Sequence, residues 1–121
     1  MAIKDEFLED VAKAVVGSDY APITRIGFAE TDTPTSNAQL VDELGDRKTV
    51  SRFNTNNQIE LEAARFGTDV VDQTNGDIIE AIGYLQSDDS GDVLRITIDL
   101  DSLQHTRDFD LSFRTVVTVN K

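Results

Sequence analysis

Acidic side chains gather in the segment SDDSGD, where Asp88, Asp89 and Asp92 lie around Gly91. Carboxylate oxygens in a tight turn are ligands that Ca²⁺ prefers. The segment does not match the EF-hand loop, which spaces its ligands over about 12 residues and ends in Glu. The pattern therefore favours a solvated hairpin turn, with a Ca²⁺ site as the alternative.

The candidate catalytic groups are one histidine and several paired carboxylates. His105 is the only histidine and the chain has no cysteine. No nucleophile motif marks a serine that could work with His105, so we expect this histidine to be exposed in a polar loop. Asp99/Asp101 and Asp108/Asp110 are spaced by two and would share one face of a strand. Acid–base work needs a cleft that shifts their pKa values, and the sequence predicts none. We expect no enzymatic activity, no cofactor and no metal.

The charge balance narrows the classes of partner. Asp and Glu number 23 against 11 Lys and Arg, which gives a formal net charge of −12 at pH 7. Such a surface repels nucleic acids and anionic membranes, and no apolar run approaches the roughly 20 residues that span a bilayer. The first residues are acidic, unlike a secretory signal peptide. The excess of Asp over Glu and of Arg over Lys resembles proteins of extreme halophiles, in which molar salt screens self-repulsion.

The clearest secondary-structure pattern lies in residues 108–119, DFDLSFRTVVTV. Apolar and polar residues alternate, so Phe113 and Val117 fall on one face of an extended chain and Arg114 on the other. This pattern predicts a strand with one buried face. Such a strand needs partner strands and a second layer over its apolar side.

Five further segments have the composition of strands, at residues 23–30, 47–54, 58–66, 78–85 and 93–100. The segment 78–85 is almost wholly apolar, which is typical of a strand buried on both faces. Loops are expected at 67–77 and 101–107, and a short helical turn at 37–44. The spacing of strands and turns predicts a mainly β fold, a single antiparallel, jelly-roll-like β-sandwich over residues 18–121.

The first 17 residues are expected to form an N-terminal α-helix outside the sandwich domain. Within residues 3–16, Ile3, Phe7, Leu8, Val11 and Val15 form an apolar stripe at helical spacing. Acids crowd the first half of this segment, which matches the helix dipole, and a glycine at position 17 is a natural terminator. The stripe packs either on the chain's own sheet or on a neighbouring subunit as a docking interface, and both interpretations stay open.

Several short motifs follow one another along the chain after this segment. They are Ile26-Gly27-Phe28, Thr33-Pro34-Thr35, Leu40, Glu43, Arg47, Ile79-Glu80-Ala81-Ile82-Gly83-Tyr84-Leu85 and Leu94-Arg95. With the N-terminal helix and the last alternating strand, they resemble small structural proteins of tailed viruses. The resemblance implies a capsid-decoration or turret module, or a tail appendage at a fibre base. The halophilic composition adds a haloarchaeal host.

The same resemblance implies partners and a location. The partners would be copies of the chain itself in a homo-oligomer, other virion proteins, and a host cell-surface layer or glycan. The location would be the virion, after assembly in the host cytoplasm, with no nucleic-acid binding and no membrane insertion. The alternative is a soluble carbohydrate- or protein-binding β-sandwich module of a halophilic cell, and a small hydrolase ranks third.

Three charged residues of these motifs are candidates for a structural ion pair. Glu43 and Arg47 lie four residues apart, close enough to pair across a helix end or a turn. Arg47 could equally pair with Glu80 in the interior, where a buried pair is costly unless it is well hydrogen-bonded. Unrelated surface charges are the alternative interpretation.

Overall fold

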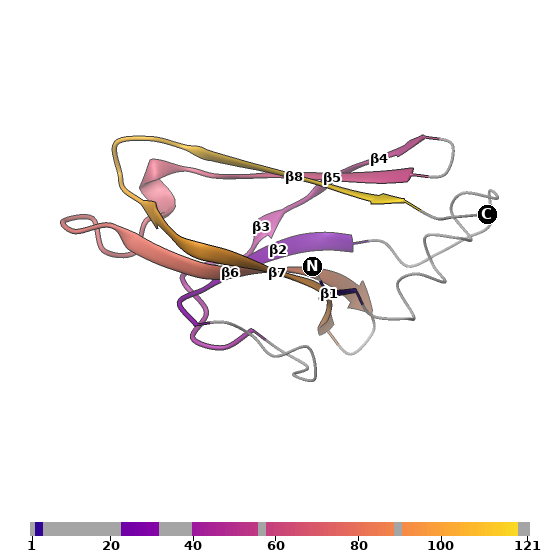
Figure 1. Cartoon of the computed structure of the whole chain (residues 1–121), viewed down its shortest axis with the longest axis horizontal. Helices are drawn as coiled ribbons and strands as arrows, with labels where there is room; N and C mark the ends of the chain where they lie inside the picture. The colour runs from indigo at the N-terminus through magenta and orange to yellow at the C-terminus, as the bar shows by residue number, and fades with distance from the viewer. Residues whose placement is uncertain (1, 4–22, 32–39, 56–57, 89–90, 119–121) are drawn as a thin grey trace.

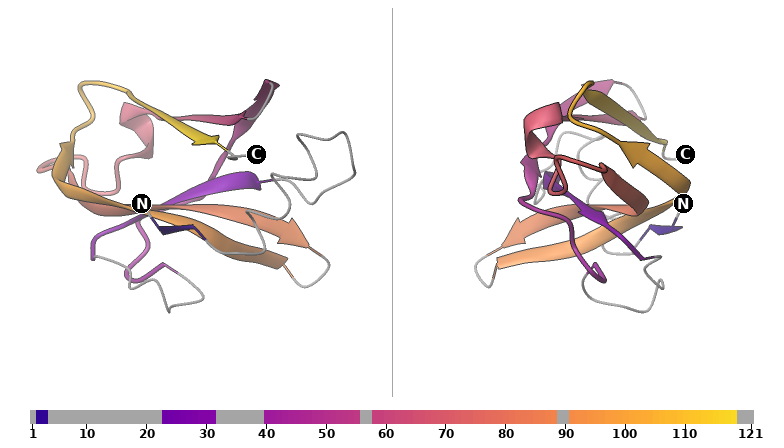
Figure 2. Two further views of the ribbon diagram at one scale, coloured as in Figure 1. Left: turned by 45° about the vertical axis from the view of Figure 1, so that its right-hand side comes forward. Right: turned by 90° about the vertical axis from the view of Figure 1, so that its left-hand side faces the viewer.

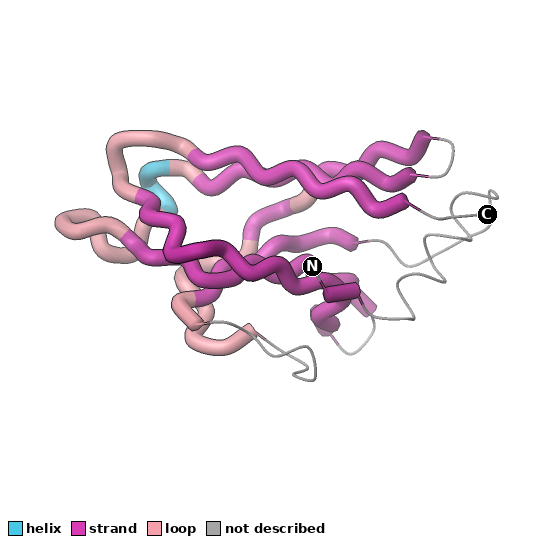
Figure 3. The backbone as a smooth tube through the Cα atoms, viewed as in Figure 1, coloured by secondary structure: helices cyan, strands magenta, loops and turns pink. Residues whose placement is uncertain are grey.

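The computed structural model describes residues 2–3, 23–31, 40–55, 58–88 and 91–118, and most of these residues lie in strands (Figure 3). A single turn of 3-10 helix interrupts them. In chain order the elements are β1 (Ala2–Ile3), β2 (Ile23–Ala29), β3 (Lys48–Thr49), β4 (Ser51–Thr55), β5 (Gln58–Arg65), η1 (Gly67–Asp69), β6 (Asp77–Asp88), β7 (Gly91–His105) and β8 (Leu111–Thr118).

The strands form two antiparallel sheets stacked as a β-sandwich, which confirms the mainly β, antiparallel part of the predicted fold class (Figure 1). One sheet has five strands in the order β1-β7-β6-β2-β3, and the other has three in the order β4-β5-β8. The alternating strand predicted near the C-terminus is β8, which pairs with β5 from Gln58↔Thr118 to Arg65↔Leu111. Its apolar side faces the five-stranded sheet, with Val117 buried in the core.

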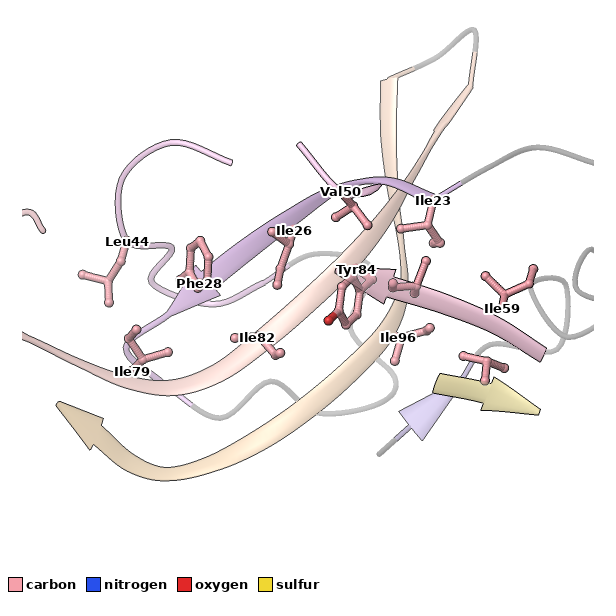
Figure 4. Close-up of a cluster of buried hydrophobic side chains, with 12 residues drawn as sticks. Ile23, Ile26, Phe28, Leu44, Val50, Ile59, Ile79, Ile82, Tyr84 and Ile96 are labelled. Atoms are coloured by element: carbon pink, nitrogen blue, oxygen red, sulfur yellow. The ribbon is translucent and has the colours of Figure 1, made fainter. Parts of the chain in front are cut away.

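The core between the two sheets is aliphatic with a few aromatic anchors (Figure 4). Phe28 of β2 meets Phe113 of β8, with ring centroids 5.5 Å apart. Tyr84 of β6 is fully buried, and its hydroxyl lies 2.7 Å from the hydroxyl of Thr115 on β8. A buried hydroxyl needs such a partner. This hydrogen bond therefore joins the two sheets across the core.

The substitution Tyr84→Phe is expected to lower the free energy of unfolding by about 1–3 kcal/mol, because it leaves the buried Thr115 hydroxyl without its partner. Thermal or denaturant unfolding in molar salt measures the change. Thr118→Val on the same strand is the control, since Thr118 is exposed. Equal stability of the two variants would contradict a bond between the sheets.

Strand β6 is buried on both faces over residues 81–86, in agreement with the apolar sequence, whereas Ile78 near its start is exposed. Ile82 and Tyr84 point into the core, while Gly83 pairs directly with Gly27 of β2 on the opposite face. A Cβ on either glycine would come within 2.8 Å of a methyl group of Leu40. The two glycines therefore provide the space in which Leu40 packs on the outer face of the five-stranded sheet.

The segment predicted as one strand at 47–54 is divided between the two sheets. β3 pairs with β2, whereas β4 pairs with β5. Val50 lies between them, is buried, and donates its backbone N–H to the carbonyl oxygen of Thr24 at 3.0 Å. The chain crosses from one sheet to the other at this residue, and sequence alternation alone does not reveal such a crossing.

The loop predicted at 101–107 is wrong in its first five residues, because β7 continues to His105. Asp77 pairs with His105 and Ile79 with Leu103, so the extension has a partner in β6. Ser102 adopts a φ of 51°, and the register with β6 shifts between Ile79 and Ala81, but the strand continues to His105. Its polar sequence made this part of β7 resemble a loop.

The predicted N-terminal helix lies mostly outside the described residues. Ile3, where the helix was expected to begin, lies in β1 and pairs with Ile96 of β7. The helical assignment of Ile3 is therefore wrong, because the sheet edge offers it backbone partners. The predicted helical turn at 37–44 is not seen over residues 40–44, where Glu43 forms an isolated β-bridge with Ala29.

Candidate functional site

A cluster of three buried polar side chains lies at one end of the sandwich. Arg65 ends β5, Asp77 begins β6 and His105 ends β7, so three strands deliver them to the same place. Their exposed fractions are 1%, 4% and 0%. The guanidinium of Arg65 donates from Nη1 to His105 Nδ1 at 2.7 Å and from Nη2 to Asp77 Oδ2 at 2.6 Å. We call these three residues the buried cluster.

The hydrogen-bond partners of His105 fix its tautomer. Its Nε2 lies 2.7 Å from the carbonyl oxygen of Phe109, which can only accept. Its Nδ1 faces Arg65, which can only donate. His105 is therefore a neutral imidazole that donates from Nε2 and accepts at Nδ1. The expectation of an exposed loop histidine is wrong, because the side chain joins β7 to the β7–β8 loop.

The carboxylate of Asp77 is the only acid in the buried cluster and is fully engaged. Burial raises the pKa of Asp77. The hydrogen bonds from the backbone N–H of Asp72, the Arg65 guanidinium and the backbone N–H of Val71 lower this pKa by more than burial raises it, so the net pKa lies below the ordinary value. The Asp72 and Val71 bonds measure 3.0 and 2.8 Å. The ionised form of Asp77 thus ties the β5–β6 loop to the strands.

Acid is expected to destabilise the domain through Asp77. Because its pKa is lower in the folded than in the unfolded chain, its contribution is present above the unfolded value of about 3.9 and is lost as the pH falls through the folded value. The free energy of unfolding, measured from pH 6 down to acid, should therefore decrease below about pH 4. Asp77→Asn should give a shallower decrease, and an unchanged pH dependence would contradict this role.

The two loops beside the buried cluster are held to each other as well as to the sheets. We call residues 66–76 and 106–110 the loop end. The backbone N–H of Gly67 donates to Asp110 Oδ1 at 2.8 Å, and a Cβ at Gly67 would collide with the carbonyl oxygen of Arg107. Gln73 donates to the carbonyl oxygens of Gly67 and Val70 at 3.1 and 2.5 Å. The loop end is therefore a built surface with many backbone bonds.

Large apolar side chains are exposed on or next to this loop end. They are Phe66, Val71, Ile78 and Phe109. Phe109 stacks beside His105 with ring centroids 5.2 Å apart, and the ammonium of Lys48 lies 5.3 Å from the centroid of Phe66. Figure 1 places both loops at the end of the sandwich opposite the end at which β4 stops and β5 begins. Exposed apolar side chains mark an interaction site where they form a contiguous patch, whereas single ones are common on protein surfaces.

The chemistry that the buried cluster can perform is limited. Among the described residues, the two ring nitrogens of His105 are occupied by Arg65 and by the carbonyl oxygen of Phe109, so neither nitrogen is placed to activate a nucleophile. In the part of the chain that the structure describes, every buried side-chain nitrogen or oxygen has a hydrogen-bond partner, and no group of His, Asp and Glu could hold a metal. The buried cluster therefore holds the β5–β6 and β7–β8 loops in place through hydrogen bonds to their backbones.

Only part of the residue set considered for Ca²⁺ lies in the described ranges. Asp92 Oδ2 lies 3.0 Å from Nη1 of Arg47 and 3.7 Å from Nε of Arg25. Asp88 lies in β6 and pairs with Gly91 of β7, and Asp89 lies outside the described residues. Asp92 therefore takes part in ion pairs on the five-stranded sheet, and the Ca²⁺ alternative stays an untested prediction.

The structure brings Glu43 and Arg47 together, with Nε of Arg47 2.7 Å from Glu43 Oε1. The inclusion of Glu80 in this set is wrong, because Glu80 accepts a hydrogen bond from Ser102 of β7. The third member of the ion-pair set is Asp92, which comes from a distant part of the sequence. Asp92 is 45 positions from Arg47, and this separation in the sequence could not predict the contact.

The other predicted site residues are also dispersed. Asp99 and Asp101 are exposed on β7, and Asp108 is exposed in the loop end. Of the predicted docking stripe, only Ile3 falls in the described residues, in β1. Phe7, Leu8, Val11 and Val15 lie outside them.

Sequence reasoning missed the buried cluster and the exposed apolar set. For His105 the alternation gave no signal, because Leu103 and His105 are out of phase with Leu94, Ile96, Ile98 and Leu100, and the register with β6 shifts between Ile79 and Ala81. Comparison of the chain with protein-family models, curated proteins and solved structures finds no match. In the described ranges, no helix has the length and apolar character needed to cross a membrane.

Proposed function

We propose that the chain is a non-enzymatic structural protein of a virion, which oligomerises as a capsid-decoration, turret or tail-appendage module on a tailed virus of a halophilic host. The two-sheet body is then a jelly-roll-like module, an architecture that many capsid proteins use. Its partners are copies of itself and other virion proteins. The predicted N-terminal helix contributes its apolar stripe to the contacts between copies.

The observation that carries the proposal is that, in the described chain, a set of charged side chains is buried and paired while several large apolar side chains are exposed. The buried ionisable groups, Arg65, Asp77 and His105, bond to one another and to loop backbone. These groups therefore stabilise loops and do not line a catalytic cleft. Four large apolar side chains are exposed around those loops. A rigid surface with exposed apolar groups supports assembly better than catalysis.

A second candidate is the soluble binding module, and one feature favours it. An open groove of about 680 Å³ is lined by Lys48, Phe66, Glu62, Ser112 and Arg114, among others. An aromatic side chain with a few polar groups around it is typical of small-ligand sites. A monomer that binds an oligosaccharide or a peptide, with loss of binding in Phe66→Ala, would favour this function over assembly.

The direct test of the virion proposal is the location of the chain in purified particles. Electron microscopy of particles labelled with an antibody against the chain is expected to place it at a repeated position on the head or tail. The matched control is the same antibody on particles that lack the chain. Recovery of the chain only from the particle-free host fraction would overturn the proposal.

The halophilic part of the proposal predicts a salt-dependent stability. The net charge of −12 destabilises the compact state by self-repulsion, and molar salt shortens the Debye length from about 10 Å at 0.1 M to about 3 Å. The melting temperature should therefore rise between 0.1 M and molar NaCl. Potassium chloride serves as a control for sodium-specific binding, and an unchanged melting temperature would remove the halophilic argument.

A further inference from the structure

The two sheets differ in the length of their edge strands. The five-stranded sheet ends in β1 and β3, each of two residues, whereas the three-stranded sheet ends in β4 with five and β8 with eight. Very short edge strands protect a sheet because they leave few free backbone groups for another chain. Among the described strands, β8 is therefore the longest edge without this protection.

Strand β8 also lacks the other features that keep an edge from pairing. Its sequence, LSFRTVVT, has no Pro, Gly or Lys, and its register with β5 runs through eight consecutive pairs without a bulge. Its single charged residue is Arg114. The guanidinium of Arg114 turns back over its own sheet, 2.7 Å from Glu60 Oε1 and 3.8 Å from Glu62 Oε1. The charge of Arg114 therefore lies toward β5 and does not block the free edge of β8.

The apolar residues at the border of the core are only partly buried mainly on the side of β7 and β8. Six partly buried apolar residues pack against the buried core, and five of them belong to these two strands. The five are Ile98, Leu100, Leu103, Leu111 and Phe113. Figure 2 shows β8 at the margin of its sheet away from β4. A further strand beside β8 would cover this side.

We propose that β8 pairs with β8 of a second copy of this chain, antiparallel and around a two-fold axis at Thr115. The inference rests on the proposed function, because it names the contact through which copies assemble. With this centre, Phe113 of one copy lies opposite Val117 of the other. Ser112 lies opposite Thr118, and Arg114 opposite Val116.

This register is self-complementary, as a two-fold contact must be. Aromatic–β-branched pairs and paired hydroxyl residues stabilise antiparallel strands, whereas like charges directly opposite destabilise them. A centre at Arg114 would place two guanidinium groups opposite each other and is disfavoured. The contact at Thr115 joins the two three-stranded sheets into one sheet of six strands and covers the half-exposed ring of Phe113.

A charge exchange at two exposed positions tests the pairing. Ser112 and Thr118 are exposed on β8, so substitutions there leave the core intact. In Ser112→Lys/Thr118→Lys, each lysine lies opposite a lysine of the second copy. In Ser112→Lys/Thr118→Glu, each lysine lies opposite a glutamate. Ser51→Lys on β4, the other edge of the same sheet, is the control.

Sedimentation velocity of the full chains in about 0.5 M salt measures the dissociation constant, at a Debye length between about 10 and 3 Å. We expect the double lysine variant to raise this constant at least about tenfold, and the lysine–glutamate variant to restore it. Adding two positive charges to a chain of net charge −12 relieves general repulsion, so weaker association of the double lysine variant cannot come from net charge.

The outcomes separate the two proposals. A monomeric wild type would overturn both this inference and the assembly function. An oligomeric wild type whose association is unaffected by the double lysine variant would overturn the β8 contact alone. Loss of association in Ser51→Lys, with β8 variants unchanged, would place the contact at β4 instead.

Discussion

Replacing Asp77 with Asn is expected to lower the free energy of unfolding by about 3–5 kcal/mol, the range found when one partner of a buried ion pair is removed. The substitution keeps the shape of the side chain but leaves the guanidinium of Arg65 charged, with an exposed fraction of 1%. The neutral imidazole of His105 is then its main side-chain partner. The loss measures what the buried cluster contributes to holding the loop end.

Asp72→Asn is the matched control for this substitution. Asp72 is an exposed neighbour whose carboxylate accepts from the backbone N–H groups of Thr74 and Asn75 at 3.1 and 3.0 Å, so Asp72→Asn should lower the free energy of unfolding much less than Asp77→Asn. Replacing both members of the buried pair, as Arg65→Met/Asp77→Leu, should cost less than Asp77→Asn alone. A loss below about 1 kcal/mol for Asp77→Asn would show that the pair does not support the fold.

Phe28→Ala is expected to have a similarly large effect, a loss of about 3–5 kcal/mol. Phe28 is 1% exposed and contacts two different parts of the structure. Its ring packs on Phe113 across the sandwich, and the Cζ of Arg65 lies 5.2 Å from its centroid. The substitution therefore leaves a cavity and removes the aromatic face under the guanidinium. Denaturant unfolding in molar salt measures the loss.

Phe53→Ala is the control for Phe28→Ala because Phe53 of β4 is 51% exposed. The free energy of unfolding of Phe53→Ala should differ from that of the wild type by no more than about 0.5 kcal/mol, as for other surface substitutions. Similar losses in the two variants would mean that Phe28 is not a central part of the core. If Phe28→Ala proves too unstable to purify, Phe28→Leu gives a smaller loss in the same direction.

The fold class could be predicted because it depends on local periodicity. The alternation in β5 and β8 has a period of two, and the apolar run of β6 indicated burial on both faces. Boundaries failed where tertiary partners overrode composition. Asp101–His105 looked like a loop but gained a partner strand in β6. At Val50 a continuous segment changes sheets, for which the sequence carries no periodic signal.

The site was harder to predict than the fold, because its members meet only in the folded chain. Arg65, Asp77 and His105 come from the ends of three strands, and no spacing rule links them. The pairing of Glu43 with Arg47 was within reach because the two lie four residues apart. Asp92 joins Arg47 across 45 positions. Gly27 and Gly83, by contrast, appear in the sequence motifs and make room for Leu40.

An assembly role gives these features a common physical reason. The buried cluster and the Tyr84–Thr115 bond hold the sandwich and its loops in one conformation, so that a surface can be presented without a large loss of entropy on binding. The long edge of β8 and the apolar loop end then supply two separate contact surfaces. In the proposed function, one of these surfaces would join copies of the chain and the other would contact a further virion protein.

The oligomeric state of the full 121-residue chain in molar salt tests the central claim most directly. Size-exclusion chromatography with light scattering, over a wide range of protein concentrations, gives the mass of the particle in solution. We predict a homo-oligomer with a whole-number multiple of the chain mass that persists on dilution. A mass equal to one chain at every concentration would contradict the account.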